Sequence, residues 1–468
     1  MSFDLLIREA QVVMPDRVEL ADLAINGARI VAIGKGLGPA AEVIEAQGLI
    51  ALPGGIDSHV HIAQPSGPGI VMADDFDSAT RAAAFGGTTT ILPFCLPEGD
   101  MPLREAVQAY HALAKGNCHV DVSFHLIIAR TDPQTLGQDL PALIEAGYTS
   151  FKVFMTYEGL RLSDGEILEV MAVAHHHDAL VMVHAENEEA IEFLRKRAEQ
   201  EGHTSPMHHA RTRPVPVERE ATHRALSLAQ IADVPLMIVH VSNAETMEEI
   251  SRARTRGQIV HAETCPQYLT LTADDLDLAG SDGFEGAKYV CSPPPRDAHQ
   301  QCRLWKGIKQ GVFDVWSSDH APFRFADSRG KDAPGARESF RNIPNGIPGI
   351  ETRLPILFSE GVTKGRISLQ QFAELTATNH ARIYGLSPNK GALVVGADAD
   401  IVLWDPQERR TIHQADLHHD ADYTPWEGFE ITGWPIVTLL RGRPIVKEGE
   451  LISPSRGAHI YRTRQREE

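Results

Sequence analysis

The chain has 468 residues, more than a single average domain and enough for a barrel with an accessory module. Hydrophobic residues make up 43% and charged residues 23%, which is typical of a soluble globular protein with a large core. Its 63 acidic and 44 basic side chains give a formal charge of −19, so we expect no general affinity for nucleic acids.

The first residues show no basic segment leading into an apolar stretch, and no run approaches about 18 uninterrupted apolar residues. We therefore expect a cytoplasmic protein that does not enter a membrane. The five cysteines form no C-x-x-C pair, which favours reduced thiols over a disulfide framework.

Both ends of the chain have the pattern of short β-strands broken by turns. Residues 3–50 contain several such apolar runs, and Asn26-Gly27 between two of them is a hairpin signal. The same pattern returns at residues 392–396, 400–404 and 436–442. We expect residues 1–54 and 387–468 to form one β-sandwich domain that ends in a solvated tail from about residue 461.

The middle of the chain alternates apolar runs with helical patterns. Helices are expected over residues 75–84, 163–176, 217–232 and 244–254. The second begins with a capping box, because Ser163 is followed three residues later by Glu166. This alternation predicts an α/β fold with a (β/α)8 TIM-like barrel over residues 55–386.

Residues that can ligate a metal stand at or near the downstream ends of separate apolar runs. They are His59, His61, Lys152, His184, His240 and Asp319. Runs of this kind are typical of buried parallel strands, whose carboxyl ends meet at one mouth of a closed barrel. The sequence therefore predicts that these side chains come together.

His59 and His61 are separated by one residue, so both imidazoles point to the same side of an extended strand. Two buried core histidines would give the same pattern. Because His184, His240 and Asp319 also end apolar runs, we favour a metal site, and imidazole with carboxylate suits Zn²⁺.

Lys152 lies inside an apolar run, where an unpaired ammonium is costly. Two interpretations remain open. The lysine forms a buried ion pair with a carboxylate such as Glu186, or its neutral amine has reacted with CO₂ to form a carbamate that bridges two metal ions. The carbamate, four histidines and one aspartate would satisfy two zinc ions and leave room for a shared hydroxide.

The segment of residues 323–348 is rich in Gly, Pro and charge, follows Asp319, and is expected to form an active-site loop. Three histidine groups, at residues 175–177, 208–209 and 418–419, also invite a metal interpretation. The first ends a helical pattern and the other two are expected in loops, so we expect all three groups to be solvated surface.

Several segments resemble the cyclic amidohydrolases: GGIDSHVH at residues 54–61, SFKVFMTY at 150–157, VHAEN at 183–187 and VHVS at 239–242. The D-hydantoinase and dihydropyrimidinase branch is the closer match. Its landmarks resemble ETCPQYL at residues 263–269, FEGAKYV at 284–290, SPP at 292–294 and IPNG at 343–346. The resemblance covers nearly the whole chain.

The resemblance implies a binuclear centre of two zinc ions per subunit, with manganese as the other metal it could hold. The ligands of the first ion would be His59, His61, carbamylated Lys152 and Asp319. The ligands of the second would be Lys152, His184 and His240. The carbamate and a hydroxide would bridge the two ions, and Asp319 would carry a proton from the hydroxide to the leaving nitrogen.

The resemblance also implies residues that bind the substrate. Tyr157 would donate to the developing oxyanion, although a tyrosine in the core would fit the same pattern. Ser292 and Asn345 would hold the amide groups of the ring, largely through backbone atoms. The activity implied is the opening of a 5-substituted hydantoin or a 5,6-dihydropyrimidine to an N-carbamoyl amino acid, by a homotetramer.

The chain departs from the resemblance after His61, where residues 62–69 are small or polar and the family often has acidic, apolar or aromatic residues. Dihydroorotases usually carry an arginine where Ala63 stands here. Allantoinase is the alternative enzyme. A non-catalytic assembly protein of the same fold is the alternative of another class, but such proteins lack the full ligand set that this chain retains.

Overall fold

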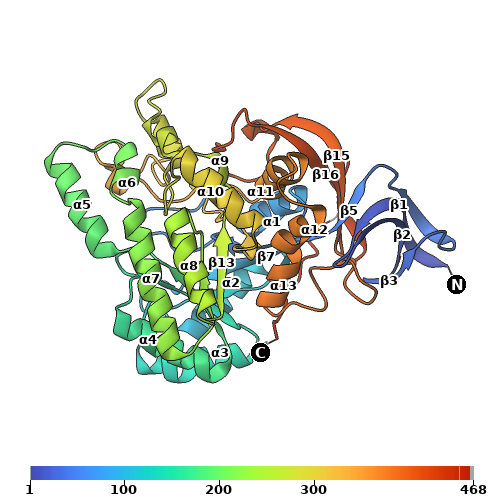
Figure 1. Ribbon diagram of the computed structural model, residues 1–468, viewed down its shortest axis with the longest axis horizontal. Helices are drawn as coiled ribbons and strands as arrows, with labels where there is room; N and C mark the ends of the chain where they lie inside the picture. Colours follow the sequence, from blue (N-terminus) through green and yellow to red (C-terminus); the bar gives the residue numbers. More distant parts are fainter. Residues whose placement is uncertain (1, 453, 464–468) are drawn as a thin grey trace.

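The computed structural model describes residues 2–452 and 454–463, and two sheets organise this part of the chain (Figure 1). In one of them, parallel strands run in the order β14-β13-β12-β11-β10-β9-β7-β6, with β8 (Asp121–Val122) beside β7. These strands are β6 (Gly55–Val60), β7 (Thr88–Cys95), β9 (His125–Ile127), β10 (Ser150–Phe154), β11 (Leu180–His184), β12 (Leu236–Ile238), β13 (Val260–Thr264) and β14 (Val315–Trp316). The chain after β14 returns to β6, because the His61 N–H donates to the His320 carbonyl at 2.7 Å. The strands therefore form a nearly closed barrel.

Every residue of β7, β10, β11 and β13 is buried, as parallel strands between a packed interior and a layer of helices require. The α-helices are α1 (Phe76–Phe85), α2 (Leu103–Ala114), α3 (Leu140–Glu145), α4 (Asp164–His177), α5 (Glu188–Gln200), α6 (Met207–Arg211), α7 (Val215–Ala232), α8 (Ala244–Thr255), α9 (Gln267–Thr270), α10 (Ala298–Lys309), α11 (Arg353–Leu357), α12 (Leu369–Ala373) and α13 (Asn379–Ile383).

The helices predicted from the sequence correspond to α1, α4, α7 and α8, with ends shifted by at most two residues. The capping box at the start of α4 is confirmed. The Glu166 N–H donates to the Ser163 hydroxyl at 3.3 Å, and the Ser163 N–H donates to the Glu166 carboxylate at 2.8 Å. Both bonds satisfy backbone or side-chain groups that the first helical turn would otherwise leave unpaired.

The second sheet joins the two ends of the chain and lies beside the barrel, at the right of Figure 1. Its order is β18-β17-β16-β15-β5-β1-β2-β3, with β4 paired to β1. The strands are β1 (Phe3–Val13), β2 (Val18–Asn26), β3 (Arg29–Gly34), β4 (Ala40–Glu45), β5 (Ile50–Pro53), β15 (Ile401–Thr411), β16 (Glu430–Leu440), β17 (Arg443–Lys447) and β18 (Glu450–Leu451). The antiparallel pairing of β5 with β15 connects the two ends. The predicted fold is confirmed, while the domain boundaries at residues 54–55 and 386–387 stay predictions.

The segment after the last strand packs against the start of the barrel strands. The Ile460 N–H donates to the Val122 carbonyl at 2.7 Å. Arg462 is buried, and its guanidinium donates to the Ser150 hydroxyl and the Phe124 carbonyl, both at 2.5 Å. The predicted solvated tail is therefore wrong at Arg462, and residues 464–468 lie outside the described residues.

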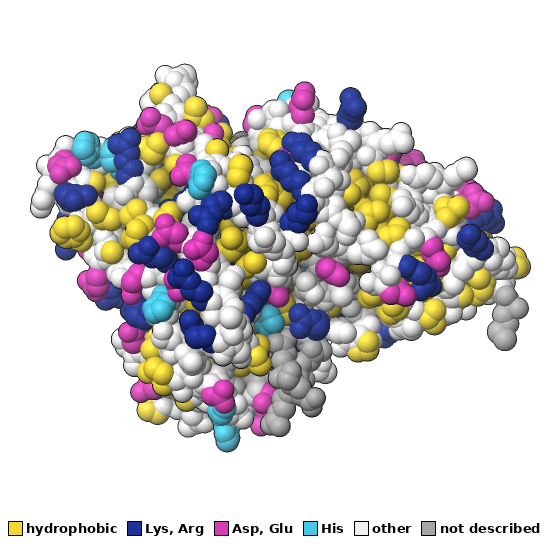
Figure 2. Space-filling model, in the orientation of Figure 1, with side chains coloured by type: hydrophobic (Ala, Val, Ile, Leu, Met, Phe, Trp, Pro, Cys, Tyr) yellow, Lys and Arg dark blue, Asp and Glu magenta, His cyan; other side chains and the backbone are white. Residues whose placement is uncertain are grey.

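All five cysteines are free, and only Cys302 among them is exposed. No helix in the described ranges has the length and hydropathy of a membrane span. Figure 2 shows acidic and basic side chains interspersed with apolar ones over the barrel helices.

Candidate active site

The predicted metal ligands meet at the carboxyl ends of the barrel strands. His59 lies in β6, Lys152 in β10, and His184 is the last residue of β11. His61, His240 and Asp319 follow β6, β12 and β14 within three residues. All six side chains are buried, and the ligand atoms of His59, His61 and Asp319 lie within 4.8 Å of one another.

Three short distances define this cluster. The Nε2 atom of His59 lies 2.8 Å from Lys152 Nζ and 3.2 Å from Asp319 Oδ1. Next to them, His184 Nδ1 lies 2.8 Å from His240 Nε2, and the His240 ring centroid is 5.3 Å from that of His59. The structure thus contains two neighbouring groups of ligand atoms, one of nitrogen and oxygen atoms beside Lys152 and one of two facing nitrogens.

Backbone conformation directs several of these side chains toward the mouth. His240, Asp319 and Tyr157 have positive φ angles of 39°, 52° and 78°. Residues other than glycine adopt this left-handed region at a cost, and such positions concentrate at functional sites. Each of the three follows the end of a barrel strand, where the turn changes the direction of the side chain.

Hydrogen bonds on the far side of the imidazoles determine which ring nitrogen faces the cluster. The Nδ1 atom of His59 lies 2.6 Å from Glu263 Oε1, which also accepts the His240 N–H at 2.9 Å. His61 Nδ1 lies 3.0 Å from Gln64 Oε1. With a proton on each Nδ1, the Nε2 atoms of His59 and His61 carry a lone pair toward the cluster, which can accept from a donor such as Lys152 or bind a cation.

His184 is held in the opposite orientation. Its Nε2 lies 2.8 Å from Glu186 Oε2, so Nδ1 faces the cluster. Burial would raise the pKa of Glu186, but the buried Arg213 guanidinium at 3.3 Å and the bond to His184 lower it to about 2. Glu186 is therefore an ionised partner of Arg213 and His184, and the ion pair between Lys152 and Glu186 considered above does not form.

Burial also sets the charge of the ligand groups. It lowers the pKa of His59, His61 and His240 well below the ordinary value, which keeps these imidazoles neutral. It lowers the pKa of Lys152 as well, against the opposing charges of Asp319 and Glu263. Lys152 Nζ lies 4.5 Å from the centre of the Phe94 ring and 4.8 Å from that of Phe154.

The cluster forms the floor of a cavity of about 500 Å³, a size suited to a small ring. Tyr157, Ser292 and Asn345 line it together with five of the six candidate ligands, all except His59. Burial raises the pKa of Tyr157, while Arg213 and the side-chain hydrogen bonds of Ser292 and Asn345 lower it. The structure thus brings the three predicted substrate-binding residues together at the Tyr157 hydroxyl.

Two loops complete the cavity wall. Gln64, Ser66 and Gly67 come from the segment after His61, and Phe323 and residues 341–345 come from the predicted active-site loop. The position of this loop agrees with the expectation from its composition.

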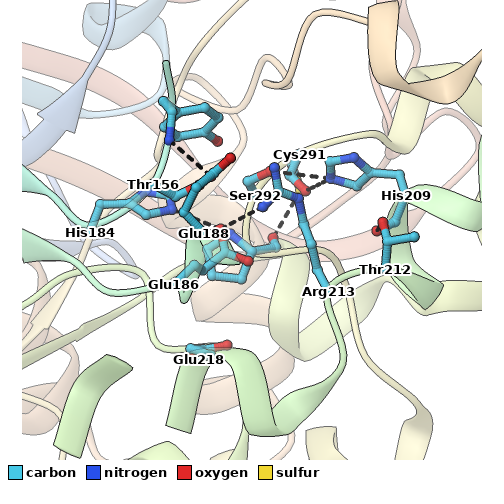
Figure 3. A network of polar contacts seen from close by, with 12 residues as sticks. Thr156, His184, Glu186, Glu188, His209, Thr212, Arg213, Glu218, Cys291 and Ser292 are labelled. Carbon is cyan, nitrogen blue, oxygen red and sulfur yellow. Dashed lines mark hydrogen bonds and ion pairs between the residues drawn. The ribbon is translucent and has the colours of Figure 1, made fainter. Parts of the chain in front are cut away.

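A polar network that sequence reasoning missed supports one side of the cavity (Figure 3). His209 lies in α6, is buried, and its Nε2 lies 2.9 Å from the Cys291 carbonyl and 3.2 Å from Ser292 Oγ. The predictions of a loop and of solvated surface are therefore wrong for His209. No signal in the local sequence indicates a partner 82 residues away.

The other histidine groups differ from one another. His175 and His176 are exposed at the end of α4, as predicted. His419 is buried, and the His418 ring stacks on Phe85 with their centroids 3.4 Å apart, so the expectation of a solvated pair is wrong there.

Comparison with known proteins agrees with this geometry. The sequence pattern described as Amidohydrolase family matches residues 50–445. The D-hydantoinase of Geobacillus stearothermophilus is 45% identical over 464 residues, which cover 98% of this chain and 96% of that protein. The D-hydantoinase of Ralstonia pickettii is 43% identical over 467 residues and is covered to 100%, with 99% of this chain.

Solved structures give the same result. The dihydropyrimidinase from Brevibacillus agri NCHU1002 superposes with a TM-score of 0.95 at 42% identity, over 99% of both chains. The L-hydantoinase from Arthrobacter aurescens has a TM-score of 0.88 at 30% identity, over 98% of this chain and 100% of that one.

The chain therefore belongs to the amidohydrolase family. Within the family it falls in the D-hydantoinase and dihydropyrimidinase branch, as the sequence predicted. It is a hydrolase that acts on carbon–nitrogen bonds in cyclic amides.

Proposed function

We propose that this protein is a binuclear zinc hydrolase that opens 5-substituted hydantoins or 5,6-dihydropyrimidines to N-carbamoyl amino acids. One observation carries the proposal. Five of the six candidate ligands and the three candidate substrate-binding residues line a single cavity at the mouth of the barrel, and the sixth ligand, His59, has its ligand atom within 4.8 Å of those of His61 and Asp319.

The side chains present fit two divalent cations. The free Nε2 atoms of His59 and His61 and the Asp319 carboxylate would hold one ion. The facing nitrogens of His184 and His240 would hold the other, because two imidazole nitrogens 2.8 Å apart need either a shared proton or a cation to offset the repulsion of their lone pairs. Neutral imidazoles and carboxylates are ligands that zinc prefers, and manganese could replace it.

Carbamylated Lys152 would be a ligand of both metal ions. Burial lowers the pKa of Lys152 to about 8, which increases the share of the neutral amine, the form that reacts with CO₂. The reaction forms an N–C bond and releases one proton, leaving an anionic carbamate with two oxygen ligands. Carbamate formation would also remove the positive charge of Lys152, which is costly to bury.

When bound, the zinc ions would lower the pKa of water and polarise the ring carbonyl. The chain's own residues have separate tasks. Asp319 would accept the proton of the attacking water and deliver it to the leaving ring nitrogen. The Tyr157 hydroxyl would donate to the carbonyl oxygen as it gains charge, and Ser292 and Asn345 would hold the amide groups of the ring.

A second candidate is an allantoinase, whose substrate is a hydantoin with a ureido substituent. Gln64 and Ser66 favour it, because these polar side chains line the cavity in the segment where the chain departs from its family.

Rates of ring opening on a 5-alkyl hydantoin, dihydrouracil and allantoin would separate the candidates. We expect one of the first two to react fastest, with activity lost on metal removal and restored by zinc. Turnover of allantoin alone would establish the second candidate, and turnover of none would refute both. The predicted homotetramer and cytoplasmic location rest on the resemblance and on the sequence pattern, and light scattering would measure the first.

A further inference from the structure

Lys331 lies in the active-site loop and is fully buried. Its Nζ atom donates to the Val290 carbonyl and to the Pro344 carbonyl, both at 2.7 Å. Both acceptors are backbone atoms, whereas Lys390, another buried lysine, contacts the carboxylates of Asp121 and Asp400.

These two carbonyls belong to the segments that carry the candidate substrate-binding residues. Val290 precedes Ser292 by two residues, and Pro344 immediately precedes Asn345. The segments also contact each other directly, since the Gly346 N–H donates to the Val290 carbonyl at 3.0 Å. His209 holds Ser292 through a separate bond (Figure 3).

We propose that Lys331 is a positioning residue that fixes Ser292 and Asn345 relative to each other, so that together they can hold the amide groups of a cyclic substrate. The proposal rests on the substrate-binding roles given to these two residues under the proposed function. Lys331 itself does not line the cavity.

The Lys331 side chain can keep the Val290 and Pro344 segments connected in either protonation state. Burial lowers the pKa of Lys331 to about 7. An ammonium has three N–H donors and a neutral amine has two, so either form can satisfy the two carbonyls. Loss of the proton removes the cost of burying a charge and leaves both hydrogen bonds in place.

Lys331→Met tests the proposal, because it keeps the length and apolar stem of the side chain and removes both donors. We expect KM for the best ring substrate to rise roughly tenfold, with kcat changed less than about threefold and zinc content unchanged. Lys288→Met is the matched control, because Lys288 lies nearby but pairs with Glu285 at 2.5 Å. It should leave both constants unchanged.

A double-mutant cycle with Gly346→Ala adds a second readout, because a Cβ at Gly346 would lie 2.5 Å from Ala321 and would displace the backbone of the Asn345 segment. If Lys331 acts through the Asn345 segment, the two substitutions should raise KM by less together than the product of their separate effects. Independent effects would contradict the proposal. An unchanged KM with lower kcat and lower melting temperature would overturn it as well, since this is the result of a purely structural role.

If Lys331→Met does not fold, Lys331→Gln takes its place in the test. The glutamine amide is too short to reach both carbonyls, so we expect the same rise in KM. Failure of this inference differs from failure of the proposed function. If only the inference fails, the parent protein opens the ring and the Lys331 variants bind the substrate as the parent does. If the proposed function fails, the parent opens no ring at all.

Discussion

At the scale of single residues, the Tyr157 hydroxyl has two possible roles that one substitution separates. Its donation to the oxyanion would be worth roughly 10²–10³-fold in turnover, whereas a core tyrosine would contribute only about 1 kcal/mol of stability. We expect Tyr157→Phe to fold normally with collapsed kcat. Tyr148→Phe is the control, since this buried tyrosine lies just before β10 and its hydroxyl bonds to His111 of α2. Equal kcat in both variants would remove Tyr157 from the mechanism.

Gln64 is the residue that orients His61. Gln64→Leu would leave His61 Nδ1 without its acceptor at 3.0 Å, so the ring could turn or change tautomer. Loss of such a partner typically costs 10–100-fold in metal affinity or activity. We expect a competition titration against a chelator to show zinc affinity weakened by about tenfold, with the exposed Gln407→Leu unchanged. Parent-like affinity in Gln64→Leu would show that the ring is held by other contacts.

At the scale of elements, the C-terminal segment binds the amino-terminal ends of barrel strands through the hydrogen bonds of Arg462. Arg462→Met would remove two bonds at 2.5 Å and leave the Phe124 carbonyl without this donor. Each lost bond to a charged donor is worth about 1–3 kcal/mol, so chemical denaturation should show a lower free energy of unfolding. Arg456→Met, at an exposed position of the same segment, should be neutral. Equal stability of both variants would mean that the segment is only loosely attached.

The sequence predicted those features that follow from strand direction and periodicity. Parallel strands place their carboxyl ends together, so His59, Lys152 and His184 could be brought together without a structure. Contacts that depend on the packing of distant segments were not predictable in this way. His209 and Arg462 are examples, because their acceptors lie in segments far away in the sequence. Glu263 gave a partial signal, since it lies near the carboxyl end of a barrel strand, as the ligands do, but its strand reads VHAET and is not an apolar run.

At the scale of the whole molecule, charged groups connect the barrel to the second sheet. Lys390 lies 2.7 Å from Asp121 of β8 and 2.5 Å from Asp400, just before β15. Arg441, just after β16, also pairs with Asp121. Burial disfavours these charges, and mutual pairing offsets that cost. Buried ion pairs therefore join the barrel to the second sheet.

Two histidines, the buried His419 and the partly buried His459, give this structure a pH dependence of stability. Burial lowers the pKa of His419 to about 4 and that of His459 to about 3. An unfolded chain binds these protons near pH 6.5, so their contribution to stability is complete above about pH 6.5 and is lost as the pH falls toward the folded values.

His459→Phe tests this dependence, because phenylalanine can replace the ring that packs 4.7 Å from Phe124. We expect the melting temperature of the variant to fall less steeply than that of the parent between pH 6.5 and about 4. Parallel curves would show that His459 is protonated as readily in the folded protein as in the unfolded chain.

The metal content of Lys152→Ala, measured beside that of the parent, tests most directly whether a two-metal centre assembles on Lys152. We predict two zinc ions per chain in the parent. The variant should lose most of its metal and activity, with partial recovery of both in the presence of short carboxylic acids that replace the carbamate. Full metal content and full activity in Lys152→Ala would contradict the account.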